Sequence, residues 1–267
     1  MKNLEQIKEN GYCILKIIDF NNTFKKNVID QLTDYLLNKI QVLKNNQLNF
    51  KSTVDISNLI PNEYKKKFIE FSDIIIKATN LNKYILFPKV LDFTCRLANF
   101  DKNIKHPTDA MLWHRDQDDY FSQIKIFFPL TEVDVSSGML SVVSKKICDS
   151  QTILLDKDLY LQKNLPNNDF LRVKDTTLRN LYSKDLFFDW KSNVGEVMLC
   201  DTNNCYHKGG YVLSPDKFRI MIQVTVGNRF THMFVYNKTK LGIYFWRMLF
   251  RLFSFMFGRQ RYIKKII

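Results

Sequence analysis

Two side chains that commonly bind metal ions, His114 and Asp116, stand two residues apart in the segment WHRDQDDYFSQIKIFFPL. They come just before an apolar run of β type, IKIFFPL. Residues two apart on a strand project from the same face, so the imidazole and the carboxylate would point at one position. The tripeptide is common by chance, and its ordinary interpretation is a hydrogen-bonded histidine beside a solvated aspartate. The spacing alone therefore indicates half of a metal site at most.

A third ligand would have to come from elsewhere in the chain, and His207 is the candidate. It follows the strand-like run EVMLC within GEVMLCDTNNCYHKGG. Two histidines and one carboxylate form the facial triad of non-haem Fe(II) oxygenases, which leaves metal positions open for a cosubstrate and O2. Zinc accepts the same donors, so these three residues leave a zinc hydrolase open as an alternative.

Arg219 separates the two interpretations. It lies twelve residues after His207, inside the β-type run FRIMIQVTV. A charge in a buried strand is costly without an anionic partner. The distal carboxylate of 2-oxoglutarate would provide that partner through a bidentate fork. Arg219 has no evident task in a zinc hydrolase, so its position favours an oxygenase.

The order of these motifs resembles the phytanoyl-CoA dioxygenase family of Fe(II)- and 2-oxoglutarate-dependent oxygenases. WHRDQDDYFSQIKIFFPLTEVDVSSGMLSVVSKK is similar to the central block of that family. GEVMLCDTNNCYHKGG is similar to its second metal segment, and FRIMIQVTV to the strand that carries its cosubstrate arginine. The N-terminal ENGYCILK followed by a helix is also similar. The resemblance thus covers residues 4–228.

The resemblance implies a mainly β fold, a double-stranded β-helix (jelly-roll, cupin-like) core with flanking helices. It implies iron ligation by His114, Asp116 and His207, with Arg219 on the far carboxylate of 2-oxoglutarate. Fe(II), 2-oxoglutarate and O2 would together hydroxylate a substrate and release succinate and CO2. The carboxylate of Asp116 argues against the halogenating relatives, which lack it.

Lys125 falls at a strand position from which some relatives contact the same cosubstrate. A surface lysine that alternates with Ile124 and Ile126 is an equally good interpretation. Two positions depart from the family pattern: the GSHK-like ending reads VSKK over residues 143–146, and Gly209 stands where relatives often carry a hydroxyl group. Neither position ligates iron, so the departures bear on cosubstrate affinity.

The elements that must position these residues follow from hydrophobic spacing. A short polar helix opens the chain, residues 12–20 form a β-type run, and residues 21–40 and 64–80 have helical spacing. Residues 40–62 are polar and indicate a loop. From residue 84 onward short β-prone runs alternate with turn residues, which predicts a sandwich or barrel.

We expect an oxygenase domain over residues 1–237, with an N-terminal strand and helices over 1–83 and the β-helix core over 84–237. A polar excursion over residues 149–190 would cross one end of the core as a lid. Residues 238–267 form a separate basic segment. Gln117, Asp118 and Asp119 would line the substrate mouth or act as ordinary loop residues, while His106 and His232 are expected to be structural or solvated.

The composition indicates a folded protein in a reducing compartment. The 267 residues are 45% hydrophobic and 14% aromatic, which supplies a sizeable core. Five scattered cysteines without a C-x-x-C pair indicate neither a disulfide framework nor a thiolate zinc site. The chain has no apolar signal-peptide core and no uncharged apolar run long enough to span a bilayer. We therefore expect a cytoplasmic protein.

The basic segment 238–267 carries eight of the positive charges and no acid, in a chain of net charge +13. As a helix, residues 241–267 would place Arg247, Arg251 and Ser254 in one polar stripe among Phe, Trp, Leu and Met. That pattern favours a helix lying on an anionic membrane, peripheral to its cytoplasmic face. A helix packed on the core or in a dimer interface is the alternative.

The basic segment also admits a protein of a different class, a non-catalytic β-barrel that binds nucleic acid or membrane. Basic aromatic segments bind single strands by charge and stacking. Contiguous apolar surface suits lipid better, so nucleic acid is disfavoured. The expected substrates are small molecules, sugars or lipid-linked molecules.

Overall fold

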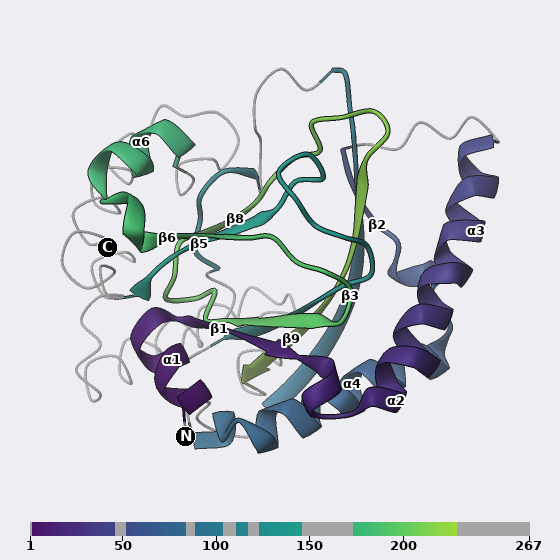
Figure 1. Cartoon of the computed structure of the whole chain (residues 1–267), viewed down its shortest axis with the longest axis horizontal. Coiled ribbons are helices and arrows are strands. Elements are labelled where there is room, and N and C mark those ends of the chain that lie inside the picture. The colour runs from purple at the N-terminus through teal and green to yellow at the C-terminus, as the bar shows by residue number, and fades with distance from the viewer. Residues whose placement is uncertain are drawn as a thin grey trace, which may run out of the picture.

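Two antiparallel β-sheets face one another in the computed structural model of the chain (Figure 1). The residues that the structure describes are 2–45, 52–83, 89–103, 111–116, 123–145 and 173–228. In spatial order, the strands of the larger sheet are β1 (Tyr12–Lys16), β7 (Glu196–Cys200), β4 (Ile124–Pro129), β9 (Phe218–Asn228), β3 (Lys89–Asn99) and β2 (Thr53–Asp55). Those of the smaller sheet are β6 (Phe187–Trp190), β5 (Leu140–Val143) and β8 (His207–Gly209).

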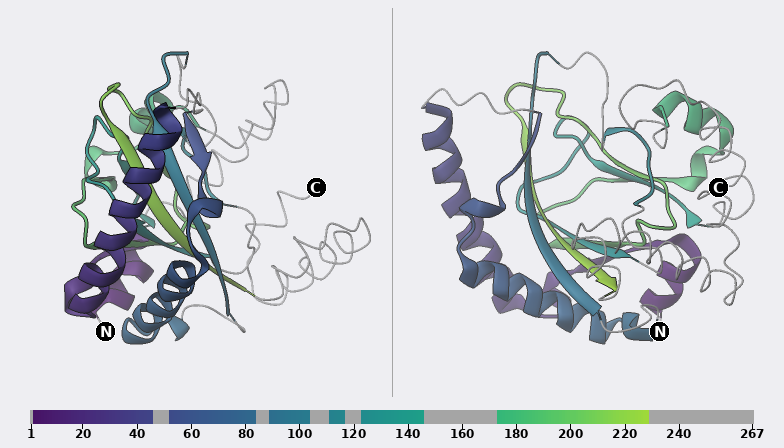
Figure 2. Two further views of the ribbon diagram at one scale, coloured as in Figure 1. Left: turned by 90° about the vertical axis from the view of Figure 1, so that its right-hand side faces the viewer. Right: turned by 180° about the vertical axis from the view of Figure 1, so that it is seen from behind.

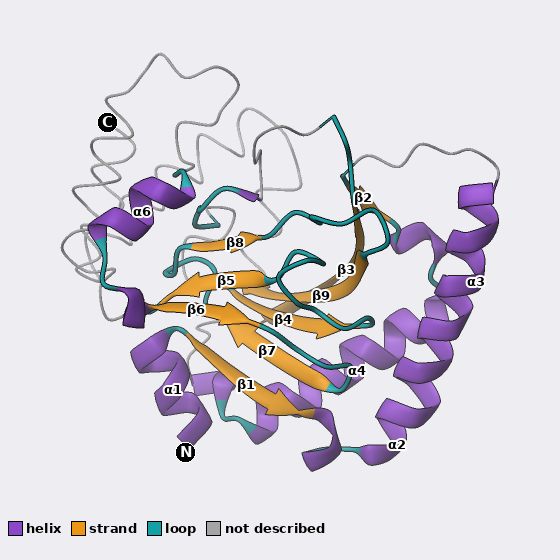
Figure 3. Ribbon diagram, turned by 45° about the horizontal axis from the view of Figure 1, so that its top comes forward, coloured by secondary structure: helices purple, strands orange, loops and turns teal. Residues whose placement is uncertain are grey.

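Helices cover the outer face of the larger sheet (Figures 1 and 3). They are α1 (Lys2–Asn10), α2 (Asn22–Phe24), the π-helix η2 (Lys25–Asp30), α3 (Gln31–Asn45) and α4 (Asn62–Ala78), with the short 3-10 turns η1 (Ile17–Asp19), η3 (Ser57–Leu59) and η4 (Leu81–Lys83). In α3, buried Leu32, Leu36 and Ile40 recur every fourth residue and so share the face toward the sheet. The apolar residues whose spacing predicts this helix are therefore largely the ones that pack it against the sheet.

Strand alternation divides the larger sheet into two different faces. On β4, Ile124, Ile126 and Phe128 point outward into the core under the helices. Lys125 and Phe127 point inward, toward the smaller sheet. Because side chains alternate along a strand, each strand of this sheet contributes one row to the helix-covered core and one row to the space between the sheets.

The smaller sheet closes the other side of that space (Figure 3). Leu140, Val142 and Trp190 pack inward against Met198 and Phe127 of the larger sheet. Behind the smaller sheet lie α6 (Asp175–Leu181) and η8 (Lys184–Leu186), as the view from behind also shows (Figure 2). A third cluster, around Trp113, Val143 and Leu178, fills the space beneath α6.

This arrangement confirms the expected fold class, a mainly β jelly-roll core with flanking helices. Three short strands differ from the expected elements. β2 lies in the region expected to be loop, β8 begins at His207 itself, and β6 ends the stretch assigned to the polar excursion. All three have too few residues to show a period in the sequence.

Several expected features lie outside the described residues, namely residues 84–87 of the β-type run KYILF, residues 149–172 of the polar excursion and the whole of segment 238–267. Among the described helices, none is both long enough and apolar enough to cross a bilayer. The four cysteines among the described residues are all buried, and none of them forms a disulfide: Cys13, Cys95, Cys200 and Cys205.

Candidate active site

The structure brings His114, Asp116 and His207 together. One ligand atom from each lies within 4.8 Å of the other two. The Nε2 atom of His207 is 3.7 Å from Oδ2 of Asp116, and Nε2 of His114 is 3.9 Å from Oδ1. Two imidazole nitrogens and one carboxylate thus face a common point, as the facial-triad hypothesis requires.

The two histidines are neighbours across an antiparallel bridge. His114 N–H donates to the His207 carbonyl (N···O 3.0 Å), and His207 N–H donates back to the His114 carbonyl (2.9 Å). The ring centroids are consequently 4.3 Å apart. Asp116 N–H donates to the Thr202 carbonyl (2.9 Å), which fixes the carboxylate-bearing segment to the loop that leads into β8. Backbone hydrogen bonds therefore set the spacing of all three side chains.

Both imidazoles are held in the same way. Nδ1 of His114 lies 2.8 Å from the Leu112 carbonyl, and Nδ1 of His207 lies 3.2 Å from the Cys205 carbonyl. A carbonyl only accepts hydrogen bonds, so in the neutral ring the proton resides on Nδ1. Each Nε2 then presents a lone pair toward Asp116, which is the tautomer that a metal ligand needs.

Lys125 lies beside the carboxylate rather than on the surface. Its ammonium nitrogen is 2.6 Å from Oδ2 of Asp116, and its side chain is only 14% exposed. Burial raises the pKa of Asp116, but the charges of Lys125, His207 and His114 outweigh it and hold that pKa below the ordinary value. The interpretation of Lys125 as a solvated surface residue is therefore wrong, because its strand position faces inward.

A pocket between the sheets contains the two histidines together with Lys125 and Arg219. Arg219 lies on β9 opposite Ala98 of β3, whose small side chain leaves space at this end of the pocket. The Nη1 atom of Arg219 is buried without a hydrogen-bond partner among the described residues. Burial also lowers the pKa of this guanidinium to about 10. A buried donor without an acceptor is costly, so this end of the pocket suits an incoming anion.

Arg96 and Gln223 also line the pocket, and the sequence reasoning missed both. Arg96 pairs with Met221 in the β3–β9 register, so it shares a face with Arg219. Its signal was present in the run VLDFTCRLANF, where a cation interrupts an apolar strand. The sequence does not show which face of this strand points inward. The β3–β9 register does, and it places Arg96 on the face of Met221 and Arg219.

The remaining candidates are placed as follows. Gly209 ends β8 and lines the pocket without a hydroxyl group. Gln117, Asp118 and Asp119 lie outside the described residues, as do His106 and His232. Their expected roles stay predictions.

No protein-family model matches the sequence, and no curated protein matches it. Solved structures do match. EvdMO1 aligns with a TM-score of 0.54 and 15% identity over 85% of this chain and 50% of EvdMO1, so the chain spans about half of that protein. Apo HygX from Streptomyces hygroscopicus gives a TM-score of 0.53 and 10% identity over 86% of each chain.

A third similar structure is SnoK, described as a non-haem alpha-ketoglutarate-dependent carbocyclase from nogalamycin biosynthesis. It aligns with a TM-score of 0.51 and 14% identity over 85% of this chain and 83% of SnoK. Identities this low show a shared fold and leave the chemistry to be argued from the site itself.

Proposed function

We propose that this protein is an Fe(II)- and 2-oxoglutarate-dependent oxygenase. The observation that carries the proposal is one pocket that contains His114, His207 and Arg219, with Asp116 beside the histidines. In that pocket, Nη1 of Arg219 is buried without a hydrogen-bond partner among the described residues. A metal site explains the triad, and a dicarboxylate cosubstrate explains the buried arginine. SnoK, which has a similar fold, is described as an alpha-ketoglutarate-dependent enzyme.

The donor set fits Fe(II). Two imidazole Nε2 atoms and one carboxylate are ligands of intermediate and hard character, and three protein ligands leave metal positions free. Bound Fe(II), with 2-oxoglutarate and O2, would supply the oxidising chemistry that amino-acid side chains lack. His114, Asp116 and His207 would hold the ion. Their orientation is preset because each histidine is already committed to a backbone carbonyl through Nδ1.

Arg219 would hold the distal carboxylate of 2-oxoglutarate, and its burial would strengthen that ion pair by excluding water. Lys125 keeps the Asp116 carboxylate ionised through their close ion pair. A contact from Lys125 to the cosubstrate, as the family resemblance implies, remains part of the proposal. Phe127, Leu140 and Met221 give the same pocket apolar walls, which limit access of water to the reacting groups.

For the reaction we propose hydroxylation of a small-molecule, sugar or lipid-linked substrate, with succinate and CO2 as coproducts. This finer assignment rests on the resemblance to the phytanoyl-CoA dioxygenase family. The proposed location is the cytoplasm, because five scattered cysteines without a C-x-x-C pair indicate a reducing compartment. A peripheral membrane contact through residues 241–267 is proposed from the sequence alone.

A zinc hydrolase is less well supported, because it offers no anion to the buried Nη1 of Arg219, which lacks a hydrogen-bond partner among the described residues. A nucleic-acid-binding barrel is less well supported for a related reason. A basic segment would bind nucleic acid equally well without a triad. That function therefore gives no reason for three candidate metal ligands to converge inside the core.

The test is anaerobic addition of Fe(II) and 2-oxoglutarate to the purified chain. A weak visible charge-transfer band and O2-dependent succinate release over a metabolite and lipid panel are expected. Asp116→Ala and His207→Ala should lose the band and the succinate release while keeping the circular dichroism of the folded chain. Full succinate release by either variant would contradict the proposal, and activity with Zn(II) in place of Fe(II) would favour the hydrolase.

A further inference from the structure

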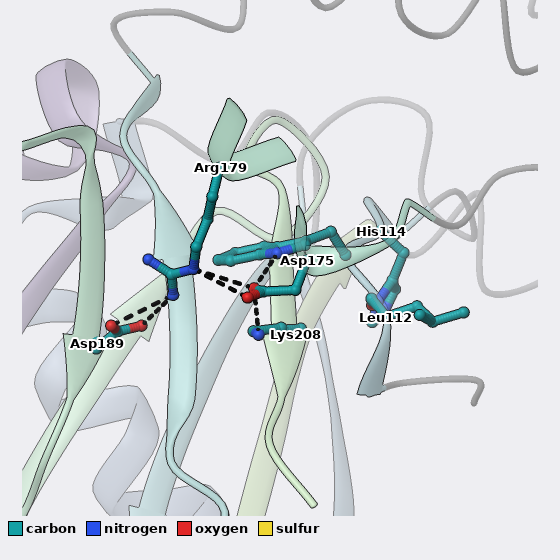
Figure 4. Close-up of polar contacts among 7 residues, drawn as sticks. Leu112, His114, Asp175, Arg179, Asp189 and Lys208 are labelled. Atoms are coloured by element: carbon teal, nitrogen blue, oxygen red, sulfur yellow. Dashed lines mark hydrogen bonds and ion pairs between the residues drawn. The ribbon is translucent and has the colours of Figure 1, made fainter. Parts of the chain in front are cut away.

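Four charged side chains form a cluster behind the smaller sheet (Figure 4): Asp175, Arg179, Asp189 and Lys208. Oδ1 of Asp175 accepts hydrogen bonds from Trp113 Nε1 (2.8 Å) and from Lys208 Nζ (2.5 Å). Arg179 donates from Nε to Asp175 (3.1 Å) and from a terminal nitrogen to Asp189 (3.2 Å). Figure 4 shows Arg179 between the two carboxylates. Asp175 thus binds Trp113, Lys208 and Arg179 at once.

Two of the three partners of Asp175 are chain neighbours of the two histidines. Trp113 precedes His114, and Lys208 follows His207. Adjacent residues of an extended, bridged segment point to opposite sides, so the histidines face the pocket while Trp113 and Lys208 contact Asp175. The antiparallel bridge between the histidines places Trp113 opposite Lys208, and the Lys208 ammonium lies 5.0 Å from the Trp113 ring centroid.

The backbone attaches Asp175 to the same place. Val173 forms an antiparallel bridge with Trp113, with hydrogen bonds of 2.8 and 3.0 Å. Asp175 follows two residues later, as the first residue of α6. The main chain therefore holds the segment from Val173 to Asp175 to the residue before His114, and the Asp175 carboxylate binds a chain neighbour of each histidine.

Strand β8 needs such support, because it has only three residues. A strand this short has little intrinsic stability, so its position depends on tertiary contacts. Lys208 is largely buried, with 16% of its side chain exposed, and Asp175 provides its ion pair. Lys208 and Arg179 both lie near the Trp113 ring, and Asp175 pairs with both. Without this carboxylate, the two neighbouring positive charges would lose the acid that they share.

We propose that Asp175 is a positioning residue for the metal site, acting from behind through Trp113 and Lys208. This inference rests on the proposed function. It assigns a positioning role to the first residue of α6, which lies within the stretch 149–190. By clamping the neighbours of both histidines, Asp175 fixes the separation and the tilt of the two imidazoles. The residue touches neither the metal position nor the pocket that holds Arg219.

The test compares Co(II) binding by the full chain and its Asp175→Ala, Asp175→Asn and Asp175→Glu variants. Partners that orient metal ligands contribute roughly 10- to 100-fold to affinity, and for this indirect contact we expect a loss of about tenfold in the Ala and Asn variants. The visible spectrum of bound Co(II), which reports ligand geometry, should change with it. Asp175→Glu keeps a carboxylate and should restore part of the affinity and the spectrum.

Asp189→Ala is the matched control. Asp189 belongs to the same cluster and pairs with Arg179. Within the described part of the chain, no hydrogen bond joins it to a neighbour of either histidine. It should lower thermal stability while leaving the Co(II) affinity and spectrum of the wild type. If Asp175→Asn folds and binds Co(II) as the wild type does, or if Asp189→Ala weakens binding equally, the inference is overturned. Failure of the wild type to bind Co(II) would overturn the proposed metal site itself, and the inference with it.

Discussion

The ammonium nitrogen of Lys125 lies 2.6 Å from Oδ2 of Asp116, the only carboxylate among the three candidate metal ligands. Both side chains are largely buried, with 14% and 10% of their surfaces exposed. The pair stabilises the metal-free chain, because each charge compensates the other. A divalent ion bound by Asp116 would meet the same ammonium as a repulsive neighbour, so Lys125 has opposite effects on the two states.

Replacing Lys125 by Met should separate these effects. The free energy of unfolding of the metal-free chain should fall by about 3 kcal/mol, because a largely buried carboxylate loses its partner. Co(II) affinity should rise, because the ion then supplies the missing positive charge. Urea unfolding and a Co(II) titration measure the two effects, and Lys125→Arg, which keeps the charge, is the control.

Unchanged stability of the metal-free variant would show that the pair contributes nothing. A higher 2-oxoglutarate requirement with unchanged Co(II) affinity would instead assign Lys125 to the cosubstrate.

Replacing Arg219 by Gln should raise the KM for 2-oxoglutarate at least about tenfold, because a charge-assisted hydrogen bond contributes roughly 1.5 to 3 kcal/mol. Fe(II) binding should be unchanged, since Arg219 makes no contact with the triad among the interactions of the described residues. Arg96→Gln removes the other pocket arginine on the same face of the sheet and is the matched control. Equal effects of the two substitutions would indicate a general charge effect rather than a carboxylate site.

The contribution of Asp175 to stability should depend on pH. Burial raises the pKa of Asp175, but the hydrogen bond and charge of Lys208, the Trp113 bond and Arg179 outweigh it, so the folded-state pKa lies below 3.8. A group with a depressed folded-state pKa stabilises the fold above its unfolded value and loses that contribution as the pH falls through the folded value. The difference in unfolding free energy between wild type and Asp175→Asn should therefore shrink below pH 3.8. Urea unfolding across this range measures it, and a constant difference would contradict the network.

Deleting residues 241–267 should abolish binding to anionic vesicles in flotation and leave 2-oxoglutarate turnover intact, because every proposed ligand precedes residue 220. The basic residues of the segment contribute about 1 kcal/mol each near an anionic surface, so salt should weaken the binding of the full chain. Neutral vesicles are the control for the apolar contribution. An insoluble truncated chain, together with a full chain that ignores vesicles, would indicate core or interface packing instead.

The triad was predictable because its parts follow simple rules. Strand periodicity relates His114 to Asp116, and the metal preference for a third donor led to His207. Arg219 followed from the cost of burying a charge in an apolar strand. The helices α3 and α4 were predictable for the same kind of reason, since their apolar residues repeat at helical spacing over several turns.

The remaining features depend on strand register, which local patterns do not contain. Lys125 meets Asp116 only because its side chain points to the inner face of the larger sheet, where β4 pairs with β7 and β9 from distant parts of the chain. Asp175 sits in a polar stretch without periodicity, and its bond to Lys208 requires α6 to fold behind β8. Strand β8 itself has three residues, fewer than any period needs to be visible.

The bridge between His114 and His207 also determines when the chain could first acquire a metal ion. The two residues are far apart in the sequence, and most of the β-helix core lies between them. Joining them therefore requires the closure of a long loop. Such non-local contacts form late, after helices and local turns. During synthesis, every helix that covers the larger sheet has left the ribosome before His207 emerges. Metal capture would thus mark the end of folding, and an ion bound there would slow the reopening of the smaller sheet rather than speed its formation.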